Sequence, residues 1–312
     1  MTDAASGPAA DVRMDLVGQT CATLTPMIAA RMRQRLPLDQ NQVTSDVERG
    51  MRSREPHRLL EGRTLGLLFR KHSTRTRVSL EVAAAHLGAT ALYLSDDQLQ
   101  LARGEPIEDT ARVLSRYLDA IAIRTFAHAE LDAFAIGATI PVINALTDEA
   151  HPLQALADLQ TVRERFGGLE GLRVAWIGDG NNVCVSLAEA CALFGAELVC
   201  AAPPGYEPPD AAISVVRDPR DAVAGAQVVA TDVWTSMGQE AEDAERRRAF
   251  GGYTVDAALL ALAEPEAIVL HCLPAHPGEE IAADVLYGPR SAVWEEAENR
   301  LHTAKALLAL IV

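Results

Sequence analysis

The feature that most constrains the fold is a regular alternation of short apolar runs with longer segments in which apolar residues recur at helical spacing. Eight apolar runs have the length and composition of buried strands: 65–69, 91–94, 120–125, 140–145, 173–178, 197–202, 226–231 and 267–272. Helical patterns lie between or after them, at 77–88, 106–118, 152–166, up to about 194, and 295–311. Parallel strands need long crossover connections, which are usually helices. The alternation therefore predicts an α/β chain of parallel sheets flanked by helices.

The length of 312 residues suggests about two domains, and we expect the boundary near residue 150. The first 60 residues have a helical pattern that permits no firm assignment.

Composition narrows the class of protein. Apolar residues make up 49% of the chain and charged residues 23%, as in a folded globular protein. The formal net charge of −15 argues against nucleic acid or an anionic membrane as the main partner. No apolar run reaches the roughly 18 residues of a membrane span, and no secretory pattern opens the chain. Five cysteines without a CxxC pair indicate reduced thiols. We expect a cytoplasmic enzyme.

One segment departs from the overall acidity. Between Arg31 and Arg77 the chain has 12 Lys or Arg against 5 Asp or Glu. Within it, Ser73 is placed to cap a helix, so that the N–H groups of residues 74–76 face outward at the positive end of the helix dipole. Arg75 and Arg77 oppose that dipole unless an anion is bound. The pattern favours a phosphate site over an ordinary capped helix with a basic first turn.

Two further candidates lie in the middle of the chain. His151 and Gln154 flank Pro152 at a helix start, although a lone histidine is more often structural than catalytic. The Gly178–Asn182 segment follows a strand but lacks the third glycine and the acidic residue of a dinucleotide site, so we do not expect NAD binding.

Two candidates follow later strands. Asp232 stands at a strand end, where parallel sheets bind ligands, and is suited either to pair with an ammonium group or to cap a helix. Cys272 is a candidate nucleophile, metal ligand with His271 and His276, or positioning group. Zinc is disfavoured because no second Cys/His pair has suitable spacing.

Together, four motifs match a family. STRTR at 73–77, HPLQ at 151–154, DVWTSMG at 232–238 and HCLP at 271–274 occur in the order and spacing of the aspartate/ornithine carbamoyltransferases. The last two resemble the ornithine branch. The resemblance covers about residues 62–312, and four motifs in register are far more specific than any one of them.

The resemblance implies transfer of a carbamoyl group from carbamoyl phosphate to the side-chain amine of L-ornithine, without cofactor or metal. It implies two α/β domains with a cleft between them, in a homotrimer whose sites lie at subunit interfaces. Residues 1–150, with a C-terminal helix at 292–312 packing back on them, would bind carbamoyl phosphate, and residues 151–291 would bind ornithine. The Leu273-Pro274 bond is expected to be cis.

The resemblance also assigns residues. Those implied for carbamoyl phosphate are Ser73, Thr74, Arg75, Thr76, Gln100 (reaching a neighbouring subunit), Arg124, His151, Gln154, Cys272, Leu273 and Arg300. Those implied for ornithine are Asn182, Asp232, Ser236 and Met237. Arg124, His151 and Cys272 are the catalytic candidates; Cys272 is expected to orient the amine rather than form a covalent bond.

Three departures from the usual family pattern leave the identity of the amine substrate open. Ala102 stands where glycine is common, the first 60 residues are atypical, and the chain from Gly205 to Pro219 is short, as though one helix of the second domain were missing. Two alternatives to ornithine carbamoylation therefore stay open: transfer to another diamino acid or diamine, and a catalytically silent homologue.

Overall fold

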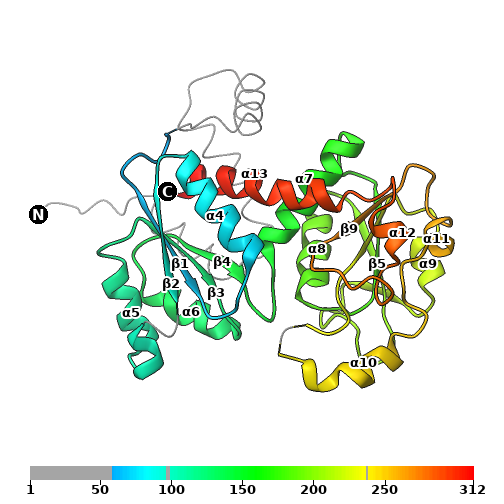
Figure 1. Cartoon of the computed structure of the whole chain (residues 1–312), viewed down its shortest axis with the longest axis horizontal. Helices are drawn as coiled ribbons and strands as arrows, with labels where there is room; N and C mark the ends of the chain where they lie inside the picture. Colours follow the sequence, from blue (N-terminus) through cyan, green and yellow to red (C-terminus); the bar gives the residue numbers. More distant parts are fainter. Residues whose placement is uncertain (1–57, 96–98, 237) are drawn as a thin grey trace, which may run out of the picture. The chain divides into compact units, whose positions relative to one another are not determined.

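The computed structural model describes residues 58–95, 99–236 and 238–312 (Figure 1). The chain divides into two compact units. One comprises the described residues up to Leu153 together with Arg300–Val312, and the other comprises Gln154–Asn299. The alternating pattern predicted this architecture, and two parallel-sheet α/β units are confirmed.

The first unit has a four-stranded parallel sheet in the order β2-β1-β3-β4. Its strands are β1 (Thr64–Phe69), β2 (Thr90–Ser95), β3 (Ala120–Arg124) and β4 (Val142–Leu146). Its helices are α4 (Thr74–His86), the 3-10 helix η2 (Gln100–Arg103), α5 (Ile107–Leu114) and α6 (His128–Gly137). Apolar side chains of the sheet, such as Ile121 and Ile123, pack with Leu131 and Phe134 of α6 to form its core.

The second unit has a five-stranded parallel sheet in the order β7-β6-β5-β8-β9. Its strands are β5 (Arg173–Ile177), β6 (Glu197–Ala201), β7 (Ser214–Val216), β8 (Val228–Thr231) and β9 (Ile268–His271). Its helices are α8 (Asn182–Leu193), α9 (Pro219–Val223), η3 (Glu240–Glu242), α10 (Asp243–Ala249), α11 (Ala257–Leu260) and α12 (Ala283–Leu286). Two helices cross the boundary between the units: α7 (Pro152–Phe166) and α13 (Val293–Ile311).

Strand and helix positions follow the sequence pattern with small differences. All eight expected strands are present, and the short β7 is an addition. Helix α5 ends at Leu114 instead of continuing to 118, because the Ser115 hydroxyl donates to the Ala111 carbonyl and the next N–H groups bond three residues back. In the segment that the sequence marks as short, residues 202–213 form an irregular connection, which leads into β7 and α9.

The Leu273-Pro274 peptide is cis, as expected. In the described part of the chain, no helix is both long enough and apolar enough to cross a bilayer.

The turn between β5 and α8 has a close packing requirement that yields a prediction. A Cβ atom at Gly180 would lie 2.1 Å from the backbone nitrogen of Pro208, whereas one at Gly168 would meet no atom within 4 Å. Because backbone cannot yield as a flexible side chain does, we expect Gly180→Ala to lower the free energy of unfolding by about 1–3 kcal/mol. Gly168→Ala should change it by less than about 1 kcal/mol. Equal denaturation midpoints for the two variants would contradict this packing.

Candidate active site

Both sheets place their loops at the carboxyl ends of parallel strands. In such sheets ligands bind where the strand order reverses direction. The reversal lies between β1 and β3 in the first unit and between β5 and β8 in the second. Three of the sequence candidates, in 70–76, in 178–182 and at Asp232, directly follow β1, β5 and β8, and the fourth, Arg124, is the last residue of β3.

The first of these loops leads into α4. Ser73 has extended backbone and is the N-cap, and its Oγ accepts a hydrogen bond from the Thr76 N–H at 3.2 Å. The predicted cap is confirmed. It also corrects one detail, because the cap uses the Thr76 N–H that we expected to face a ligand. The N–H groups of Thr74 and Arg75 lie in the same first turn, at the positive end of the helix dipole.

Arg77 does not have the anion-binding role that its position in the first turn of the helix suggested. Its Nε donates to Glu81 Oε1 at 2.9 Å, one helical turn along α4. Its guanidinium also stacks on the ring of Tyr93, 3.8 Å from the ring centroid. These contacts give Arg77 a structural role, so the first-turn positive charge does not need an anion at this residue.

A cationic cluster surrounds His151 in the first unit. His151, Arg124 and Arg300 are all buried, with 3–6% of each residue exposed. Arg300 donates through Nη2 to Thr76 Oγ1 at 3.1 Å, which connects α13 to the start of α4. Burial first, and then the charges of Arg300, Arg124 and Arg75, hold the pKa of His151 well below its usual 6.5. The imidazole is therefore neutral at pH 7, beside three guanidinium groups.

Two other residues implied for carbamoyl phosphate have different surroundings. Gln154 is buried in the second unit, where its Nε2 donates to Asp158 at 2.8 Å and to Glu296 at 2.7 Å. Gln100 is exposed at the start of η2, and its Oε1 accepts from Arg103 at 3.4 Å.

In the second unit, Asp232 is the centre of the candidate site. It is buried, and its Oδ2 accepts from Asn181 Nδ2 at 2.9 Å, across the strand-order reversal. Its Oδ1 accepts from the Cys272 thiol at 3.1 Å. Asn181 itself is the N-cap of α8, with its side-chain oxygen accepting from the Val183 and Cys184 N–H groups. The loops after β5, β8 and β9 thus meet at one carboxylate.

The Cys272 thiol is held in its protonated form. Burial first, and then the nearby carboxylates of Asp232, Glu296 and Asp158, raise the pKa of Cys272 well above 9. A thiol that donates to a carboxylate is neither a thiolate nucleophile nor a proton acceptor. The geometry therefore favours the positioning role among the alternatives that the sequence left open.

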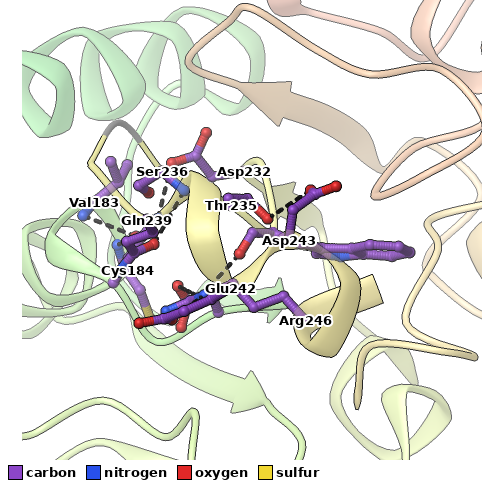
Figure 2. A network of polar contacts seen from close by, with 12 residues as sticks. Val183, Cys184, Asp232, Thr235, Ser236, Gln239, Glu242, Asp243 and Arg246 are labelled. Atoms are coloured by element: carbon purple, nitrogen blue, oxygen red, sulfur yellow. Dashed lines mark hydrogen bonds and ion pairs between the residues drawn. The ribbon is translucent and has the colours of Figure 1, made fainter. Parts of the chain in front are cut away.

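The segment after β8 is held by a polar network (Figure 2). Ser236 N donates to Gln239 Oε1 at 3.0 Å, and Thr235 Oγ1 donates to Asp243 at 3.1 Å. Of the other two residues implied for ornithine, Asn182 begins α8 and is half-buried, while Met237 lies outside the described residues.

Arg246 anchors this network from α10. Its Nη1 donates to Asp179 at 2.8 Å and to the Trp234 carbonyl at 2.9 Å, and its Nε donates to Glu242 at 2.9 Å. Burial raises the pKa of Asp179 to about 6 despite this ion pair. One buried guanidinium thus connects the loop after β5 with the loop after β8.

Sequence reasoning missed Arg246, and it considered Asp179 and Asn181 only as part of the 178–182 segment, without giving either a role. An asparagine directly before a helix is a strong N-cap pattern and could have singled out Asn181. Nothing local in the sequence indicates that Arg246 reaches Asp179, 67 residues earlier.

The side chains of this region offer little to a metal ion. Asp232, His271 and Cys272 have ligand atoms within 4.8 Å of one another. However, His271 Nδ1 accepts from the Leu273 N–H at 2.9 Å, and its Nε2 lies 3.1 Å from Glu280. Both ring nitrogens are engaged and the thiol is protonated, so the donor set does not fit a metal as it stands. A second group, His276, Glu279 and Glu280, includes a carboxylate, that of Glu279, paired with Arg247 at 2.9 Å.

Comparison with known proteins finds a family match in each half of the chain. The family model for the aspartate/ornithine carbamoyltransferase carbamoyl-P binding domain matches residues 38–164, and that for the Asp/Orn binding domain matches residues 170–311. The chain belongs to the aspartate/ornithine carbamoyltransferase family. The resemblance drawn from the four motifs is confirmed.

Individual family members are similar over most of their length. An ornithine carbamoyltransferase of Acidothermus cellulolyticus is 55% identical, over 88% of this chain and 93% of its own. One of Symbiobacterium thermophilum is 57% identical, over 81% and 86%. Among solved structures, ornithine carbamoyltransferase from Pyrococcus furiosus has a TM-score of 0.82 at 46% identity, covering 95% of each chain.

The depressed pKa of His151 predicts a pH dependence of stability. The unfolded chain protonates this histidine near pH 6.5 and the folded chain only at lower pH, so the unfolded state binds more protons between the two values. The stability contributed by the neutral imidazole is present above pH 6.5 and is lost as the pH falls below it. The slope is at most about 1.4 kcal/mol per pH unit.

Denaturation from pH 5 to 7.5 checks this expectation. His151→Gln should lose less stability on acidification than the wild type, while His72→Gln, at an exposed position, should follow the wild type. Parallel curves for the wild type and His151→Gln would contradict it.

Proposed function

We propose that this protein transfers the carbamoyl group of carbamoyl phosphate to the side-chain amine of L-ornithine, giving L-citrulline and phosphate. The observation that supports it most directly is the group of three arginines around the neutral His151, beside the capped first turn of α4. Relatives that are ornithine carbamoyltransferases at 52–57% identity support the choice of ornithine.

In this proposal the first unit binds the phosphate. Backbone N–H groups of the α4 first turn, the hydroxyls of Ser73, Thr74 and Thr76, and the guanidinium groups of Arg75 and Arg300 surround its oxygens. Helix N-termini and arginine forks are the usual partners of phosphate in proteins. Gln154, Leu273 and, from a neighbouring subunit, Gln100 complete the contacts to carbamoyl phosphate.

Arg124 and His151 act on the carbonyl group. The amine nitrogen attacks the carbonyl carbon, the new N–C bond forms, and the C–O bond to phosphate breaks. Negative charge develops on the carbonyl oxygen, where preorganised donors are most effective. A neutral imidazole donates a hydrogen bond without surrendering its proton. The proton that the amine loses ends on the released phosphate, which leaves as the monohydrogen dianion.

The second unit binds the amino acid through Asn182, Asp232, Ser236 and Met237. The attacking amine must be neutral, and for an alkylamine with an ordinary pKa of about 10.4, deprotonation at pH 7 costs roughly 4.6 kcal/mol. Positive groups around the phosphate lower that cost. The Cys272 thiol is protonated and donates a hydrogen bond to Asp232. It orients the attacking amine and takes no proton from that amine.

The relatives, which are ornithine carbamoyltransferases, do not favour the second candidate, transfer to another diamino acid or diamine. The short 202–213 connection packs against the Asn181 loop, where the Gly180 N–H donates to the Tyr206 carbonyl at 2.9 Å. This connection therefore supports the loop from which Asn181 donates to Asp232.

We also propose a cytoplasmic homotrimer that serves arginine biosynthesis. Four cysteines in the described part of the chain, Cys184, Cys191, Cys200 and Cys272, are unpaired thiols, as suits a reducing compartment. Light scattering of the purified protein measures the assembly directly.

Incubation with carbamoyl phosphate and a panel of amines tests the activity. We expect a ureido product from L-ornithine at a higher kcat/KM than from 2,4-diaminobutyrate, lysine or putrescine. A higher kcat/KM for any of those amines would favour the second candidate. No product from any amine would leave the silent-homologue hypothesis standing.

A matched pair of arginine variants tests the phosphate site. Arg75→Ala removes one donor to phosphate and should lower kcat/KM for carbamoyl phosphate by about 100-fold or more. Arg77→Ala lies one half-turn further along α4 but removes only the contacts to Glu81 and Tyr93, so it should stay within about threefold of the wild type. Equal losses in steady-state assays would contradict the assignment.

A further inference from the structure

We propose that His271, with its ring orientation fixed by Glu280, is a positioning residue that holds the 272–274 segment in its reactive conformation. This inference rests on the proposed function, because it assigns a role to the segment that contains Cys272 and Leu273. It concerns two side chains to which neither the motif comparison nor the preceding mechanism gives a task.

The segment needs such support because its backbone is strained. Leu273 has φ of +57°, in the left-handed region that residues with a Cβ avoid. Strain of this kind persists where the surrounding structure over-determines it. Here the Leu273 N–H donates to His271 Nδ1 at 2.9 Å, two residues back in the chain. The His271 imidazole thus fixes the strained Leu273 through a hydrogen bond from the Leu273 backbone N–H.

That hydrogen bond also decides where the ring proton lies. Because Nδ1 accepts from an amide, the proton of the neutral ring is on Nε2. Nε2 lies 3.1 Å from Glu280 Oε1, and neither side chain has any solvent exposure. The carboxylate therefore selects the tautomer that can accept from Leu273.

Glu280 is itself held at one carboxylate oxygen and at its backbone. The same Oε1 accepts from the His276 N–H at 2.6 Å, and the Glu280 backbone carbonyl accepts from the Val255 N–H at 2.8 Å. From the other direction, the His271 N–H donates to Glu296 Oε2 at 2.8 Å. The ring is thus fixed relative to the backbone on which Cys272 and Leu273 follow.

The consequence for the reaction is geometric. Cys272 places its thiol 3.1 Å from Asp232, so a shift of the 272–274 backbone also displaces the thiol from the carboxylate. A misplacement of about 1 Å in a reacting constellation can cost about 100-fold in rate. A purely structural pair would instead affect stability and leave kcat intact.

Two amide variants of His271 separate these possibilities. His271→Asn places an amide oxygen near the position of Nδ1 and retains the acceptor for Leu273, but does not reach Glu280. His271→Gln places its amide near the position of Nε2 and reaches Glu280, but has no acceptor at the Nδ1 position. We expect kcat for citrulline formation to fall by about 10-fold in His271→Asn and by about 100-fold in His271→Gln, with smaller changes in KM. Glu280→Ala should lower kcat by about 10-fold.

Two controls accompany the rates. Binding of inorganic phosphate, which the proposal assigns to the first unit, should be unchanged in each variant. Amide exchange measured by mass spectrometry on a peptide covering 271–275 should show protection retained in His271→Asn and lost in His271→Gln. The exchange result does not depend on activity. If the wild type formed no citrulline, the proposed function would fail, and exchange would still decide the positioning role.

Several results would overturn the inference. Equal kcat in the Asn and Gln variants, or a slower Asn variant, would show that the Nδ1 acceptor is not what matters. Equal amide protection in the two variants would do the same. An unchanged kcat in Glu280→Ala would remove Glu280 from the pair.

Discussion

The chemistry of this protein depends on where parallel strands end. In each unit the order of strands reverses once, and the loops on the two sides of the reversal begin at the same sheet edge. The Asn181–Asp232 hydrogen bond crosses this point in the second unit, between residues 51 positions apart in the sequence. Sheet topology alone thus brings together side chains that no local pattern relates.

Each sheet edge has its own electrostatic character. In the first unit, guanidinium groups of Arg124 and Arg300 are buried beside His151, and burial together with their charge keeps the imidazole neutral. In the second unit, burial and then the buried carboxylate of Asp232 keep the Cys272 thiol protonated. The buried arginines of the first unit suit an anionic substrate with a good leaving group. The buried carboxylate of the second unit suits an amine. The two environments are therefore complementary to the two substrates of a carbamoyl transfer.

Much of the fold and part of the site follow from local sequence. Apolar runs and helical spacing located all eight expected strands, and Ser73 was predicted as a cap because capping acts over three residues. Charge alone gave a wrong prediction at Arg77, which was expected to need a bound anion. Its guanidinium instead contacts Glu81 and Tyr93 within the fold. Arg246 was missed because its role arises only when α10 packs against loops that follow other strands. Glu280 was missed because its partner His271 lies nine residues earlier, at no helical or strand spacing that would pair the two side chains. The site residues taken from the family resemblance remain predictions.

The most direct test of the central claim is a crystal structure of the protein with a phosphonoacetyl bisubstrate compound bound. The account predicts phosphonate oxygens within about 3 Å of the first turn of α4 and of the Arg300 guanidinium. It also predicts the amino-acid portion of the compound against Asp232. An empty α4 turn, with the compound bound elsewhere, would contradict the account.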